Sequence, residues 1–99
     1  MPVTRLTEAQ IQDALKTLAG WAVKGVQMSK QYAFKDFMEA MAFVTRVAGL
    51  AEQADHHPDI TIRYNRVILT LSTHSAGGLT EKDMALARQI EAGGSVPRC

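Results

Sequence analysis

The chain has 99 residues, 46% of them apolar, and its 11 basic and 10 acidic residues give a formal net charge of +1. This length predicts one domain over residues 1–99, with residues 92–99 as a flexible tail. The charge gives no sign of a nucleic-acid-binding surface, and no apolar run approaches the roughly 20 residues of a membrane span. A single cysteine, Cys99, cannot form an intrachain disulfide, which favours a reducing compartment and a cytoplasmic location.

A helix and then a hairpin are predicted in the first third of the chain. Thr7 and Gln10 form a capping-box pattern, and Gly20 is expected to end the helix. The apolar stripe between them consists of Ile11, Leu15 and Leu18. Next, "WAVKG" leads into "VQMSKQYAF", where apolar residues alternate and Lys30 is the one polar member of the apolar face. This alternation predicts two short antiparallel strands.

A long second helix is predicted from residue 37 to about residue 54. Asp36 and Glu39 repeat the capping signal at its start. The apolar stripe of this helix consists of Phe37, Met41, Val44, Val47 and Ala48. Pro58 disfavours helical backbone at the residue before it, so the helix should end near the histidine pair at 56–57.

Two more strands and a third helix complete the predicted order α-β-β-α-β-β-α. Apolar and polar residues alternate over 60–64 and 67–72, and Asn65-Arg66 is expected to form the two-residue turn because asparagine tolerates a positive φ. The last helix begins with Thr80 and Asp83, has Met84, Ala87 and Ile90 on one face, and ends at Gly93-Gly94. The fold class is α+β, a four-stranded antiparallel sheet with three helices packed on one face. The uncovered face is a candidate for subunit contacts.

The expected turn at 65–66 brings distant histidines together. It makes three cross-strand pairs that are all apolar, as a buried face requires: Tyr64 with Val67, Ile62 with Leu69, and Ile60 with Leu71. The same register continued outward sets His57 opposite His74. The three histidines, His56, His57 and His74, are therefore predicted to line one cleft.

Two carboxylates are expected within reach of these imidazoles. Glu52 lies four residues before His56, one helical turn away, and Asp83 lies in the first turn of the last helix. Histidine has a reference pKa of about 6.5, so it both gives and takes a proton near neutral pH. The cluster suits general acid–base catalysis, such as loss of water from a hydroxylated carbon beside a nitrogen, with carboxylates fixing the tautomers.

Other interpretations of the same residues remain open. Three histidines can bind zinc with one open position, although neighbouring residues of an extended chain point to opposite faces, which opposes a shared ion at His56 and His57. Taken singly, a histidine before proline fits a helix C-cap, Asp83 a helix cap and Trp21 a core residue. Only the convergence of the histidines argues for a site.

One spaced set of residues extends from Glu52 through His56-His57-Pro58, Tyr64 and His74 to Asp83. This spacing resembles the signature of the pterin-4a-carbinolamine dehydratase family. The resemblance extends through "FKDFMEAMAFVTRVAGLAE", "DHHPD", "YNRVILTLSTHSAGGLTEKD" and "LARQIE", which cover most of residues 30–91, and Trp21 matches upstream.

The resemblance implies a homodimer or homotetramer that dehydrates 4a-hydroxytetrahydropterin to quinonoid dihydropterin in tetrahydrobiopterin recycling, without a metal or other cofactor. It implies that His56, His57 and His74 are the pocket imidazoles, with acid and base roles unassigned, and that Asp83 is the supporting carboxylate. Glu52 is implied as a supporting carboxylate for the histidine pair at 56–57. The residues matching pterin-contacting positions are Asp55, His56, His57, Ser72, Thr73, His74 and Ser75, with Trp21 as an aromatic near the pocket.

Two positions differ from animal members of the family. Ile60 replaces the tryptophan of "DHHPEW", and Ser75 replaces the glutamate of "STHE", so side contacts to the pterin should differ while the imidazoles are kept. Two non-catalytic roles stay open: a dimerisation partner of a transcription factor, as in some animal members, and an accessory to molybdopterin enzymes. No direct nucleic-acid or membrane contact is expected.

Overall fold

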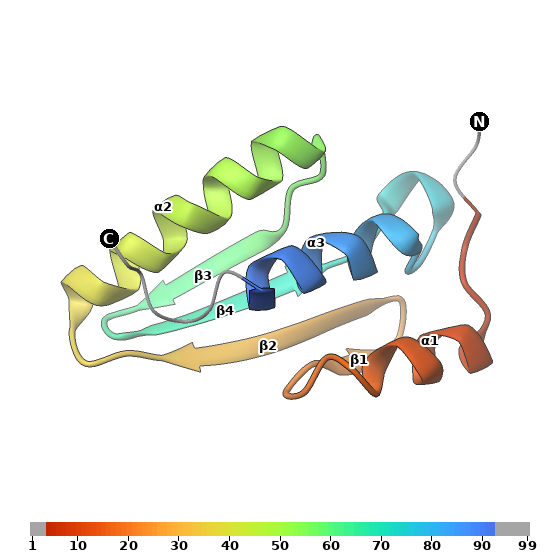
Figure 1. Cartoon of the computed structure of the whole chain (residues 1–99), viewed down its shortest axis with the longest axis horizontal. Coiled ribbons are helices and arrows are strands. Elements are labelled where there is room, and N and C mark those ends of the chain that lie inside the picture. The colour runs from red at the N-terminus through yellow and green to blue at the C-terminus, as the bar shows by residue number, and fades with distance from the viewer. Residues whose placement is uncertain (1–3, 93–99) are drawn as a thin grey trace.

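The computed structural model describes residues 4–92 and confirms the α+β fold and the order of its elements, with one added 3-10 turn. The elements are α1 Glu8–Leu15, β1 Ala22–Lys24, β2 Gln27–Ala33, α2 Phe37–Ala54, β3 Asp59–Arg63, β4 Arg66–Leu71, η1 His74–Ala76 and α3 Glu81–Ala92. Helices α2 and α3 lie over one face of the sheet (Figure 1). The predicted helix end at Gly93-Gly94, the tail beyond residue 92 and Cys99 lie outside the described residues.

Helices α1 and α2 begin where the capping patterns predict. The Thr7 hydroxyl accepts a hydrogen bond from the Gln10 backbone N–H, and the Gln10 side chain accepts one from the Thr7 N–H. Asp36 accepts from the Glu39 N–H at 2.9 Å. These side chains satisfy backbone donors that have no partner inside the helix, which fixes the first turn of each.

Four antiparallel strands form one sheet in the order β1-β2-β4-β3. Met28 of β2 faces Leu71 of β4, and Ile60 of β3 faces Leu69 of β4, so apolar side chains gather on the helix-covered face. The opposite face carries mainly polar side chains: Lys24, Gln27, Ser29, Gln31, Asp59, Thr61, Arg63, Arg66 and Thr70.

The β3–β4 register differs from the prediction by two residues. The turn is Tyr64-Asn65, not Asn65-Arg66, so Ile62 pairs with Val67 and Ile60 with Leu69. Tyr64 takes the left-handed conformation (φ 54°), whereas Asn65 is tied by hydrogen bonds to Phe34, the residue that follows β2. Because side chains alternate with a period of two, a shift of two keeps each residue on its predicted face but moves its partner.

Helix α1 is shorter than predicted. It ends at Leu15, and the chain continues through i to i+3 turns in which the Leu18 N–H donates to the Leu15 carbonyl. Leu18 is still fully buried. Gly20 lies in the turn that follows, with φ 89°, and a Cβ there would lie 2.8 Å from the Lys30 side chain. Gly20 thus shapes the entry into β1 rather than the end of the helix.

The buried face of α2 is also displaced from the predicted stripe. Ala40, Phe43, Val47 and Ala51 are buried, whereas Phe37 is 45% exposed. Only Val47 belongs to both sets. Ala40 and Ala51 are small and let the helix approach α3 and β4 closely. A stripe chosen by large apolar side chains does not include them.

Lys30, the polar residue on the apolar face of β2, is held by a half-buried polar cluster. The Glu91 carboxylate accepts hydrogen bonds from Lys30 Nζ (2.9 Å), Tyr32 Oη (2.5 Å) and Trp21 Nε1 (3.2 Å). Burial tends to raise the pKa of Glu91, but the bonds from Tyr32 and Lys30, the Lys30 charge and the indole bond outweigh it and leave the pKa below its ordinary value. Burial, reinforced by Glu91, raises the pKa of Tyr32 well above its ordinary value, so the phenol remains a donor.

Replacing Glu91 by glutamine should lower the free energy of unfolding at pH 7 by roughly 1–3 kcal/mol, because Lys30 and Tyr32 lose a charged acceptor. A lowered native pKa contributes stability that is present above the unfolded value, about 4.3, and is lost as pH falls through the native pKa. Urea unfolding of both proteins from pH 7 to 3 should therefore show the difference shrinking below about pH 4.3. Glu81→Gln, at an exposed pair with Arg88, should change stability by less than ~1 kcal/mol.

No helix within residues 4–92 is long and apolar enough to cross a membrane.

Candidate active site

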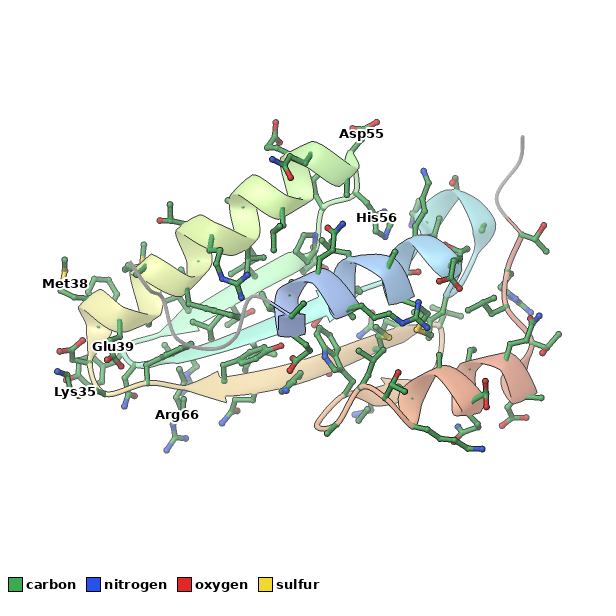
Figure 2. All side chains as sticks on the ribbon, in the orientation of Figure 1. Lys35, Met38, Glu39, Asp55, His56 and Arg66 are labelled. Carbon is green, nitrogen blue, oxygen red and sulfur yellow. The ribbon has the colours of Figure 1, made fainter. Side chains whose placement is uncertain are left out.

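Two backbone hydrogen bonds end α2 and set the direction in which the chain continues to His56. The His56 N–H donates to the Ala51 carbonyl at 3.1 Å, and the Asp55 N–H donates to the Glu52 carbonyl at 3.3 Å. Asp55 adopts the left-handed conformation (φ 52°) that this Schellman arrangement requires, and aspartate tolerates it better than most residues. Figure 2 shows Asp55 at the outer end of α2 and His56 turned toward α3.

The start of α3 holds a fully buried carboxylate, that of Asp83. Its Oδ2 accepts from the Thr80 backbone N–H at 2.9 Å and from the Thr73 hydroxyl at 2.8 Å. Since the Thr73 hydroxyl has one proton, the Thr80 hydroxyl must donate in the 2.7 Å contact between the two threonines. Two donors from two segments, the Thr73 hydroxyl and the Thr80 N–H, therefore fix Asp83 in one orientation, at a helix N-terminus that favours a negative charge.

Asp83 and His56 form a close pair. His56 Nε2 lies 2.6 Å from Asp83 Oδ1, and the His56 side chain is only 11% exposed. As a carboxylate, Asp83 only accepts, so His56 Nε2 carries a proton and Nδ1 of the neutral ring is the free acceptor. Within residues 4–92 every buried side-chain nitrogen or oxygen has a hydrogen-bond partner. His56 Nδ1 has no partner among these residues, so it must be accessible to solvent. This pair can take a proton at Nδ1 with the resulting charge stabilised by Asp83.

Glu52 pairs with His57 rather than with His56, the residue one turn away that the sequence indicates. His57 Nε2 lies 2.6 Å from Glu52 Oε2. The left-handed turn at Asp55 takes His56 off the helix, so helical spacing no longer applies to it. The pair is open to solvent, with side chains 54% and 77% exposed. The two neighbouring imidazoles thus have different environments, one enclosed and one solvated.

The β-ladder does not place His57 opposite His74. It ends with the pair Asp59 and Thr70, and His74 begins η1 beyond it with an exposed side chain. The loop after Thr73 is closed by a bridge to Gly78. Figure 1 shows η1 at the same end of the molecule as the end of α2. The contacts of His74 with the other two histidines therefore remain a prediction.

The remaining residues predicted to contact the pterin differ in their exposure to solvent. Thr73 is buried and occupied with Asp83, whereas Ser72 is half-buried and Ser75 exposed. Trp21 is buried in the core and donates to Glu91, near the end of α3 opposite Asp83. Its bonds therefore do not connect it with His56.

Sequence reasoning missed the hydroxyls that orient Asp83. The spacing of Thr80 and Asp83 indicated a cap, and the observed Thr80 N–H bond to Asp83 is one half of such a box. The part played by Thr73 follows from the loop closure and had no local signal. Within residues 4–92, no three histidine, cysteine or acidic side chains group as a metal site.

The chain matches the family model described as pterin 4 alpha carbinolamine dehydratase over residues 4–93. A protein of Thermomicrobium roseum, assigned provisionally as a pterin-4-alpha-carbinolamine dehydratase, is 58% identical over 88 residues, covering 89% of this chain and 95% of that protein. A protein of Sulfurisphaera tokodaii with the same provisional assignment is 44% identical over 88% of this chain and 94% of its own.

Two solved structures are similar in fold. One, described as a transcriptional coactivator/pterin dehydratase from Brucella melitensis, has 44% identity and a TM-score of 0.86, covering 90% of this chain and 97% of that one. The other is a pterin dehydratase-like protein described as a RuBisCO assembly factor in the alpha-carboxysome. It has 28% identity and a TM-score of 0.61, covering 77% of this chain and 89% of that one.

Proposed function

The chain belongs to the pterin-4a-carbinolamine dehydratase family, and we propose that it removes water from a 4a-hydroxytetrahydropterin to give the quinonoid dihydropterin. The C4a–hydroxyl bond breaks and the hydroxyl leaves as water after gaining a proton. N5 loses its proton, and its electron pair completes the C4a=N5 double bond. The reaction therefore needs one proton donor and one proton acceptor on adjacent atoms, which is work for side chains that titrate near neutral pH.

The His56–Asp83 pair is the observation that supports this proposal. Asp83 fixes the tautomer of His56, so Nδ1 is the ring atom available to the substrate. A buried carboxylate behind the ring stabilises the imidazolium that forms when Nδ1 takes a proton. His56 would act as the base toward N5–H in this scheme, with Asp83 as its positioning residue.

His57 and His74 are proposed to supply the proton for the leaving hydroxyl. Both side chains are exposed, which lets them exchange protons with water between turnovers. Glu52, bonded to His57, would hold that ring in position. Asp55, Ser72, Ser75, Trp21 and Thr73 stay in the proposal as matches to pterin-contacting positions, Thr73 acting through Asp83.

A turnover assay tests the proposal directly. The decay of synthetic 4a-hydroxytetrahydropterin between pH 7 and 8.5 should be faster with the protein than in buffer. His74→Ala should lower kcat by about 10²-fold or more, because it removes a proposed proton donor. Arg88→Gln, which removes an exposed charge on α3, should have no effect on kcat. Wild-type protein no faster than buffer would contradict the enzymatic proposal.

A non-catalytic role is the second candidate, favoured by the descriptions of the two similar structures as a coactivator and an assembly factor. In that case a partner protein would be bound equally by the wild type and by a variant lacking all three histidines. A wild type that is inactive and binds a stoichiometric partner would support the non-catalytic role. A wild type that dehydrates the substrate fast would mean that any partner binding is a second role beside catalysis.

A further inference from the structure

A hollow lies on the uncovered face of the sheet, at the β3–β4 turn. Its volume is about 570 Å³, within the range of small-molecule sites. It is lined by Gln31, Arg63, Tyr64, Asn65, Arg66 and Ile68, so two guanidinium groups and no carboxylate face it. Figure 2 shows Arg66 pointing to the side of the sheet away from α2 and α3.

The two arginines are direct cross-strand neighbours, since Arg63 pairs with Arg66 at the closing position of the hairpin. Like charges directly opposite on a sheet repel and destabilise the pair. Within residues 4–92 neither guanidinium has an ion pair or a hydrogen bond to another side chain. An anion bound between them would remove this repulsion.

The turn also presents an aromatic ring beside the arginines. Tyr64 is 67% exposed although its backbone occupies the left-handed region, where a bulky residue is disfavoured. Asn65 cannot turn away, because its amide nitrogen donates to the Phe34 carbonyl at 2.8 Å. A fixed turn therefore carries a flat apolar surface next to paired positive charges.

We propose that this hollow binds a small phosphate ester that carries a planar ring, such as a nucleotide. Arginine forks match phosphate oxygens in pairs, and the Tyr64 ring would pack against the planar group. The site is separate from the histidines, because His56 precedes β3 and Arg63 ends it, about 20 Å apart at the rise of an extended chain. The proposal does not depend on the dehydratase reaction.

Calorimetric titration of the full chain with pyrophosphate, AMP and adenosine tests this assignment. Pyrophosphate and AMP should bind and adenosine should not. Arg63→Gln and Arg66→Gln should each weaken pyrophosphate and AMP binding about tenfold or more. Arg88→Gln, which removes the same charge from α3, should leave both affinities unchanged. Tyr64→Ala should weaken AMP binding and leave pyrophosphate binding intact.

Thermal unfolding gives an independent readout. Pyrophosphate should raise the melting temperature of the wild type but not of the Arg63→Gln/Arg66→Gln variant. Without ligand, that variant should unfold at the same temperature as the wild type or a higher one, because the repulsion is gone. Absence of pyrophosphate binding at millimolar concentration, or equal loss in Arg88→Gln, would overturn the proposal. So would a change of oligomeric state in the arginine variants without phosphate binding, which would identify a protein contact.

Discussion

Asp83→Asn should lower kcat for dehydration by about 10²–10⁴-fold while the protein stays folded. The asparagine oxygen can replace Oδ2 and still accept from Thr73 and the Thr80 N–H. Its amide nitrogen then faces His56 Nε2 and must donate to it. The proton of the ring moves to Nδ1, so the atom proposed to take the substrate proton no longer accepts. Steady-state turnover over pH 6–9, with thermal unfolding as the check on folding, measures the effect.

A positioning role makes a prediction that a purely structural role does not. The nitrogen NMR shifts of His56 should report an Nε2–H tautomer in the wild type and an Nδ1–H tautomer in Asp83→Asn. His56→Gln should lose a similar factor in kcat, and the double variant should be little worse than either single one, since the two residues act as a unit.

Glu52→Gln is the matched control, because it replaces the carboxylate of the other pair, His57–Glu52, by an amide. That pair is exposed, and a glutamine oxygen can still accept from His57 Nε2 and hold the ring, so kcat should fall far less than in Asp83→Asn. If Asp83→Asn kept nearly wild-type turnover, or if Glu52→Gln were the more damaging change, His56–Asp83 would not be the proton-accepting pair.

The fold could be predicted from the sequence wherever a local rule acts alone. The capping residues Thr7 and Asp36 mark the starts of α1 and α2, and alternation marks the strands. The prediction was wrong where two local choices compete. Either Tyr64-Asn65 or Asn65-Arg66 makes a two-residue turn that keeps the apolar faces, and the bonds from Phe34 to Asn65, a contact across the sheet, decide between them.

The candidate site shows the same limit. The sequence indicated that Glu52 and Asp83 lie near the histidines, and both do, but it paired Glu52 with His56 by helical spacing. The left-handed residue at Asp55 ends that spacing one residue early. The buried bonds from the Thr80 hydroxyl to Thr73 and from the Thr73 hydroxyl to Asp83 join a loop to a helix start, so no periodicity in the chain could reveal them.

Phe43→Ala should lower the free energy of unfolding by about 3–5 kcal/mol, a large share of the 5–15 kcal/mol typical of a domain. Phe43 is 2% exposed, and its ring lies 4.5 Å from that of Tyr32 and 5.1 Å from that of Phe34. Alanine would leave a cavity between α2 and the sheet and remove two aromatic contacts. Urea unfolding should show a lower midpoint with an unchanged slope.

Phe37→Ala is the control that separates the observed face of α2 from the predicted stripe. Phe37 opens the helix and is 45% exposed, so its loss should cost well under half as much as the loss of Phe43. An equal cost at both positions would mean that α2 turns the predicted stripe toward the core. Such a rotation would also re-aim Asp55 and His56 at its end, and the pairing of His56 with Asp83 would then have no structural basis.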